Sequence, residues 1–164
     1  AGTVAITSPI IAQAKLERLA KAFKKMYKDE TASTVGVIDE EELGREFVTE
    51  KGILSITKVN HKDKSSIVYQ CKSKSMYETL TFYVGFDEVK QIVDGYYCLE
   101  TSTQSLGYGI FKNNNDVIGK YKDYDGKGSV IFANTTRTSN AVQKAVDTAL
   151  NDLKTRDFSN AWGE

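Results

Sequence analysis

The sequence has few of the residues on which metal and nucleophile chemistry depends. It contains one histidine and two cysteines in 164 residues, and the cysteines do not form a Cys-x-x-Cys pair. Zinc sites need several Cys, His or carboxylate ligands at short spacings, so we expect no metal centre. Neither G-x-x-x-x-G-K-[ST] nor G-x-G-x-x-G is present, and no Ser or Cys stands in a nucleophile elbow. We therefore expect no cofactor.

Two weaker candidates for chemistry also fail. His61 lies in the predicted turn His61-Lys62-Asp63-Lys64, a charged setting that does not suggest a catalytic base. The segment Asp123 to Gly128 resembles a calcium loop, but with Gly126 at the sixth position the first and twelfth residues are not suitable oxygen ligands. We name no catalytic residue and favour a non-enzymatic protein, while an active site of dispersed Tyr, Glu and Lys residues stays open.

Long apolar runs are missing as well. No stretch approaches the roughly 18 to 20 apolar residues of a membrane-spanning helix, and the first residues lack the basic and apolar regions of a signal peptide. The sequence therefore predicts a soluble chain without a transmembrane segment, and leaves cytoplasm and export both open. Because 22 cationic residues balance 22 anionic ones, we do not expect nucleic acid as the main partner.

Local charge is uneven although the total is balanced. Residues 1–28 carry six cations against one anion (net +5), and residues 29–50 carry eight anions against one cation (net −7). Neighbouring blocks of opposite sign either face each other within the fold or complement the next copy in an assembly.

The basic block coincides with a predicted amphipathic helix at residues 10–28, where apolar residues recur every three or four positions. Its lysine-rich face either is solvated or contacts a membrane surface, a protein that binds basic helices, or nucleic acid. The tail at residues 156–164 holds an aromatic pair that we expect to dock on its own domain or on a neighbouring molecule. The candidate partner contacts are thus Lys21, Lys24, Lys25, Lys28, Phe158 and Trp162.

From residue 53 to 134, short alternating apolar runs separated by turn signals indicate an antiparallel β-meander. Leu80, Phe82 and Val84 share one face, and Asp94-Gly95 predicts a type I′ hairpin turn. Residues 87–93 are alternatively a short helix. The predicted strands are 53–60, 65–72, 76–85, 87–93, 96–102, 105–112, 116–122 and 129–134.

Further elements are predicted outside the meander. A short strand at residues 3–7 and an extended piece at 34–38 flank the basic helix. A second helix at 40–51 begins at the N-cap Asp39 and ends at Gly52. A third, at 138–155, has its apolar residues on one stripe and packs on the sheet. Cys71 and Cys98 lie on predicted strands, as two buried thiols or as a disulfide if their Cα atoms come within about 7 Å.

We therefore predict a single α+β domain over residues 1–164. A mainly helical part (1–52) precedes a strongly bent antiparallel meander of six to eight strands, with both terminal helices on its concave side, in the outline of a helix-grip domain. The leading hypothesis is a binding or assembly protein that contacts copies of itself, as a homo-oligomer, or a protein partner. The alternative is a carrier of a small apolar ligand, held against the last helix by Tyr69, Phe82, Tyr96, Tyr108 and Phe111.

Overall fold

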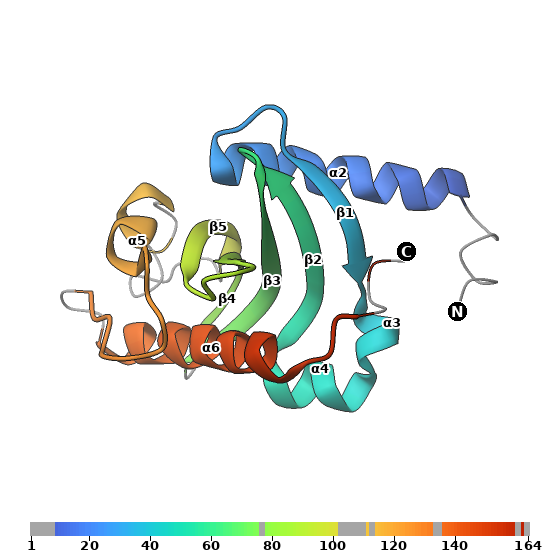
Figure 1. Ribbon diagram of the computed structural model, residues 1–164. Coiled ribbons are helices and arrows are strands. Elements are labelled where there is room, and N and C mark those ends of the chain that lie inside the picture. Colours follow the sequence, from blue (N-terminus) through green and yellow to red (C-terminus); the bar gives the residue numbers. More distant parts are fainter. Residues whose placement is uncertain are drawn as a thin grey trace.

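A computed structural model describes residues 9–75, 78–101, 111, 114–132, 136–159 and 162. It has the α+β architecture that the sequence predicts, with helices packed on one antiparallel sheet (Figure 1). The helices are α2 (Pro9–Tyr27), α3 (Glu40–Leu43), α4 (Arg45–Lys51), α5 (Asn114–Tyr121) and α6 (Thr136–Thr155). The strands are β1 (Ser33–Ile38), β2 (Ile53–His61), β3 (Lys64–Ser75), β4 (Glu78–Asp87) and β5 (Val93–Thr101).

The sheet is an open meander in the order β1-β2-β3-β4-β5, and every strand pairs antiparallel with the next one along the chain. Strands β2, β3 and β4 form where we predicted them, and β1 corresponds to the extended piece at 34–38. Six to eight strands and the helix-grip outline are not confirmed, because the described residues form five strands. The predicted strand at 3–7, and that at 105–112 apart from Phe111, lie outside the described residues.

The two long helices lie on opposite faces of the sheet, so the prediction that both pack on its concave side is wrong. The cross-strand row Ile56, Tyr69, Val84 and Tyr96 belongs to the core beneath α5 and α6. The adjacent residue on β3, Val68, points to the other face and packs with the α2 residues. A strand alternates its side chains, so neighbouring positions serve different helices.

Three segments of the predicted meander differ from the structure. Residues 116–122 lie largely in helix α5, because Val117 and Tyr121, both buried, are one helical turn apart. Residues 129–132 form no strand, and 133 and 134 lie outside the described part of the chain. The segment 87–93, predicted to be a strand or a short helix, instead contains the turn between β4 and β5, at residues 88–90, where Asp87 accepts two backbone N–H bonds. Asp94 and Gly95, predicted to form that turn, lie inside β5.

The predicted helix at 40–51 is broken in two. Gly44, with φ of 91°, separates α3 from α4. Both predicted ends are confirmed: the Asp39 carboxylate accepts a hydrogen bond from the Glu42 amide at 3.1 Å, and Gly52 ends α4 in the left-handed region at φ 70°. Among the described helices, none combines the length and the apolar character needed to cross a bilayer.

Candidate functional site: a lysine-lined cleft

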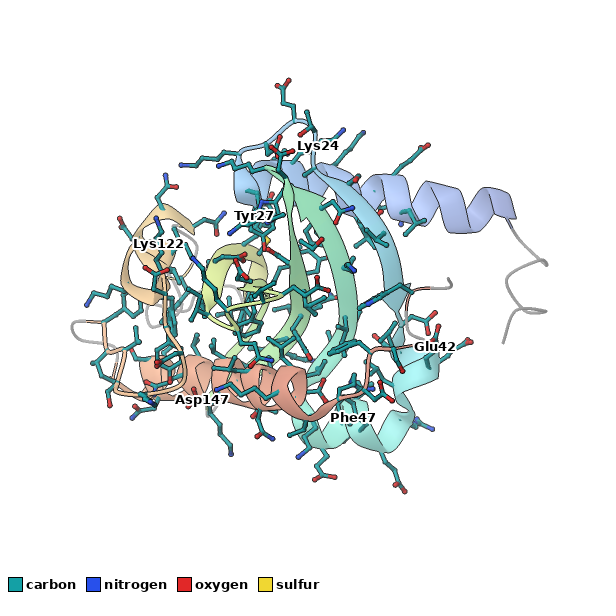
Figure 2. All side chains as sticks on the ribbon, viewed as in Figure 1. Lys24, Tyr27, Glu42, Phe47, Lys122 and Asp147 are labelled. Carbon is teal, nitrogen blue, oxygen red and sulfur yellow. The ribbon has the colours of Figure 1, made fainter. Side chains whose placement is uncertain are left out.

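A cleft of about 920 Å³ opens where four segments meet at one end of the sheet. The segments are the last turn of α2, the β2–β3 turn, the β4–β5 connection, and α5 with the residues after it. Tyr27 of α2 and Lys122, just beyond α5, lie on its two sides (Figure 2). The volume falls in the range of ordinary ligand-binding clefts. This lysine-lined cleft contains Lys25, Lys28, Lys62, Lys64, Lys90 and Lys122.

The cleft carries an excess of positive charge. Its six lysines face three carboxylates, those of Asp87, Asp94 and Asp123. Lys64 lies 3.4 Å from Asp87 and 3.6 Å from Asp94. Within the described part of the chain, the other five lysines have no carboxylate at ion-pair distance. Cations gathered on the walls of a concave site focus a positive potential, so the cleft attracts anions.

A polar network forms the inner wall of the cleft. The rings of Tyr27 and His61 stack with centroids 3.7 Å apart, and the Tyr27 hydroxyl donates to Asp94 at 2.8 Å. Ser66 also donates to Asp94, and its oxygen lies 2.7 Å from His61 Nε2. Because the single hydroxyl proton of Ser66 is directed at the carboxylate, Nε2 of His61 must be the donor to Ser66.

This tautomer excludes a hydrolase-type triad. In such a triad the imidazole accepts the serine proton, and the carboxylate orients the opposite ring nitrogen. Here Asp94 and Ser66 both lie on the Nε2 side, and Nδ1 has no hydrogen-bond partner among the described residues. Burial lowers the pKa of His61, although Asp94 opposes the shift, and burial also raises the pKa of Tyr27. Both rings are therefore neutral near pH 7.

Two glycines allow α2 to approach the sheet at this point. Gly85 and Gly95 are register partners on β4 and β5. A Cβ atom at Gly85 would overlap the Tyr27 hydroxyl, and one at Gly95 would lie 2.8 Å from Met26 and Tyr27. Glycine is therefore required where the helix meets the strands, and Gly95 serves this contact rather than a turn.

Backbone strain gathers around the cleft. Among the described residues, all non-glycine positions with positive φ lie in its four segments. They are Lys28 (54°), Lys62 (48°), Asp63 (64°), Gln91 (57°) and Asp123 (66°). Backbone hydrogen bonds fix two of these positions. The Lys62 amide donates to the Asp29 carboxylate at 2.8 Å, and the Asp123 amide donates to the Val93 carbonyl at 2.9 Å. Strained backbone of this kind is concentrated at functional sites.

Only some of the partner contacts that the sequence predicted line the cleft. Lys25 and Lys28 line the cleft, whereas Lys21 and Lys24 are exposed on α2 outside its lining. Phe158 and Trp162 stack on each other and pack, half-buried, against the core of their own chain. Trp162 lies over Gly36 of β1, so the aromatic tail docks intramolecularly. A role in partner binding stays a prediction for the residues outside the cleft.

The candidate ligand-cavity residues lie in the core on the α6 side. Tyr69, Phe82, Tyr96 and Phe111 are each at most 2% exposed. Phe82 and Tyr96 have centroids 5.4 Å apart, and the Tyr69 and Tyr96 hydroxyls bond to Asp152 and to the Phe111 carbonyl. Tyr108 lies outside the described residues. The apolar carrier stays a prediction.

No disulfide joins Cys71 and Cys98 in this structure. Cys71 on β3 and Cys98 on β5 are both register partners of Phe82, so strand β4 lies between them. Strands are about 4.8 Å apart, which puts the two Cα atoms roughly 10 Å apart, beyond the reach of a disulfide. Burial raises the pKa of the Cys71 thiol, so this side chain behaves as a small core residue.

Sequence reasoning missed Lys62, Lys64, Lys90 and Lys122, although a signal for three of them existed. In a meander every second turn lies at the same end of the sheet, so the β2–β3 and β4–β5 turns, with their lysines, must be neighbours. Lys122 gave no such signal, because its segment was predicted to be a strand. A scan against protein-family models and a search of the curated proteins both find no match for this chain.

Proposed function

We propose that this protein is a non-enzymatic binding protein, and that its lysine-lined cleft takes an acidic surface of a protein partner. The observation that supports this most is the set of five cleft lysines without an ion-pair partner in the described residues. Like charges held close together repel one another, and a bound polyanion relieves that repulsion.

The construction of the cleft favours binding over catalysis. Ser66 directs its proton to Asp94, so His61 cannot activate it as a nucleophile. Tyr27 has a raised pKa and donates to the same carboxylate, so it stays protonated near pH 7 and cannot serve as a general base. These groups tie α2 to the sheet, and of the cleft lysines Lys64 lies 3.6 Å from the same Asp94 carboxylate.

The distribution of the charges favours a protein partner. Lysine is a flexible point charge, suited to several carboxylates spread over a surface rather than to one planar group. Met26, Ile92 and Ile118 add aliphatic surface to the cleft, beside the rings of Tyr27 and Tyr96, and can cover the aliphatic parts of glutamate side chains.

Fluorescence anisotropy of a labelled oligoglutamate peptide tests the proposal at low salt. We expect Lys25→Gln/Lys90→Gln/Lys122→Gln to weaken binding at least roughly tenfold, since each lost charge contact costs about 0.5–1 kcal/mol. The matched control is Lys72→Gln/Lys127→Gln/Lys144→Gln, which removes the same charge from exposed positions outside the cleft.

Two outcomes would overturn the proposal. The first is an unchanged affinity in the cleft variant, or a loss of affinity as large in the control variant. The second is an equal loss in Lys21→Gln/Lys24→Gln, because that result would assign binding to the exposed face of α2. Matching circular dichroism spectra and melting temperatures show that each variant is folded.

A further inference from the structure

Helices α3 and α4, the acidic helices of this chain, carry charge opposite to that of the lysine-lined cleft. Their glutamates Glu40, Glu41, Glu42, Glu46 and Glu50 are all exposed. Only Glu50 has an ion-pair partner in the described part of the chain, its neighbour Lys51 at 3.8 Å. The cationic residues of the two helices, Arg45 and Lys51, leave the pair with a net negative charge.

The acidic helices cannot reach the cleft of their own chain. They connect β1 to β2, whereas the β2–β3 turn in the cleft follows the far end of β2. Strand β2 has nine residues, so its two ends are roughly 26 Å apart along the strand at about 3.3 Å per residue. Glu42 and Lys122 accordingly lie at opposite ends of the molecule in Figure 2. The lysines of the cleft and the glutamates of α3 and α4 therefore cannot pair with each other within one copy.

We infer that the partner is a second copy of this chain, and that α3 and α4 of one copy dock in the lysine-lined cleft of the next. This inference rests on the proposed function, because it names the occupant of the same cleft. The size is suitable for α3, with α4 at the mouth of the cleft: α3 has four residues, and a helix of diameter about 10 Å and rise 1.5 Å per residue occupies roughly 500 Å³ over that length. The cleft measures about 920 Å³.

The arrangement determines the kind of assembly. Different surfaces on opposite ends of a protomer make a head-to-tail contact, which leaves one free cleft and one free acidic end on every dimer. The contact therefore repeats and produces chains or rings rather than a closed two-fold dimer. Exposed charges are screened beyond about 10 Å at 0.1 M salt, so the assembly should dissociate as salt rises.

A mixing experiment by sedimentation velocity tests the inference at low salt. The cleft variant is Lys25→Gln/Lys90→Gln/Lys122→Gln, and the acid variant is Glu41→Gln/Glu42→Gln/Glu46→Gln. The wild type should form a concentration-dependent series of oligomers, and each variant alone should be monomeric. An equimolar mixture should give one heterodimer and nothing larger, because the acid end of one variant fits the intact cleft of the other.

Neutral glutamine is used so that the altered surfaces do not attract one another. The control Lys72→Gln/Lys127→Gln/Lys144→Gln should form oligomers at least as large as those of the wild type, because Lys72 and Lys144 line a pocket with Glu50 of α4 and their loss makes that end more negative. A wild type that stays monomeric at every concentration and salt, or a mixture that stays monomeric, overturns the inference. If the wild type is monomeric but its cleft still binds oligoglutamate, the partner is a different protein and the proposed function stands. If neither self-association nor oligoglutamate binding is seen, both the inference and the proposed function are overturned.

Discussion

The two faces of the sheet are built in different ways. Beneath α6 the contacts are mainly apolar, and rings such as those of Phe82 and Phe111 are fully buried. The hydroxyls of Tyr69 and Tyr96 donate to Asp152 and to the Phe111 carbonyl, respectively. Beneath the end of α2, a stacked Tyr27 and His61 pair lies on a buried carboxylate network, and strained backbone surrounds it. The first arrangement stabilises the fold. The second combines a polar network with strained backbone, a combination that is concentrated at functional sites.

The largest effect should come from filling the space that the glycines leave under α2. Gly85→Ala places a methyl group on the Tyr27 hydroxyl, so we expect a loss of about 1–3 kcal/mol in the free energy of unfolding. Oligoglutamate binding should weaken as well, because α2 carries Lys25 into the cleft. Urea denaturation and anisotropy measure the two effects.

Gly119→Ala provides the control for that change. Gly119 is exposed within α5 and a Cβ there meets nothing within 4 Å, so alanine should be neutral or stabilise by up to about 1 kcal/mol. Equal effects of the two substitutions would contradict a special closeness of α2 to the sheet.

Removing one tyrosine hydroxyl from each face of the sheet should have a smaller effect on stability and should distinguish the two faces. Tyr27→Phe and Tyr69→Phe each remove one hydroxyl that donates to an aspartate, at 2.8 Å and 2.7 Å. We expect each to cost about 1–2 kcal/mol in unfolding free energy. Only Tyr27→Phe should change the affinity for oligoglutamate, since Tyr69 is remote from the cleft in the core. A change of affinity in both variants would show that the faces are not independent.

The smallest effect should appear as a pH dependence confined to the α2 face. Burial lowers the pKa of folded His61 below its ordinary 6.5, so the unfolded chain binds a proton that the folded chain rejects. Stability should therefore decline as the pH falls below about 6.5. The Asp29 and Asp87 carboxyls have pKa values below their ordinary 3.8, so their contribution is lost only in a much more acidic range.

His61→Phe removes the titrating group and retains an aromatic ring against Tyr27. Its overall stability should be lower, because the hydrogen bond to Ser66 is lost. Urea midpoints measured from pH 7.5 to 5.5 should then be flat in the variant and sloping in the wild type. Parallel slopes in the two proteins would assign the pH dependence to other groups.

The sequence predicted local features that depend on a few neighbouring residues. The alternation at Leu80, Phe82 and Val84 and the caps Asp39 and Gly52 all have a short-range physical cause. The errors arose where a residue serves a distant contact. Gly95 was interpreted as a turn residue because Asp-Gly favours positive φ, yet it lies in a strand to admit Tyr27, more than sixty positions away in the chain.

The candidate site was harder to predict because four segments build it. Lys25 and Lys28 were noted as part of a basic helix, but nothing local to that helix distinguishes them from Lys21 and Lys24. Whether a lysine of α2 lines the cleft or lies outside it depends on which side of the last turn of this helix faces the sheet. His61 was set aside as a residue of a charged turn. It lies at the end of β2 instead, 4% exposed, because Tyr27 covers its ring.

Zero-length carbodiimide cross-linking of an equimolar mixture of ¹⁴N- and ¹⁵N-labelled protein can detect the head-to-tail contact itself. It joins lysines to carboxylates in contact, and mass spectrometry identifies pairs that come from two copies. If α3 and α4 dock in the cleft of the next copy, mixed-isotope links should join the cleft lysines Lys25, Lys62, Lys90 or Lys122 to the glutamates of α3 and α4. Mixed-isotope links that join those glutamates only to lysines outside the cleft, such as Lys21 and Lys24, would contradict it.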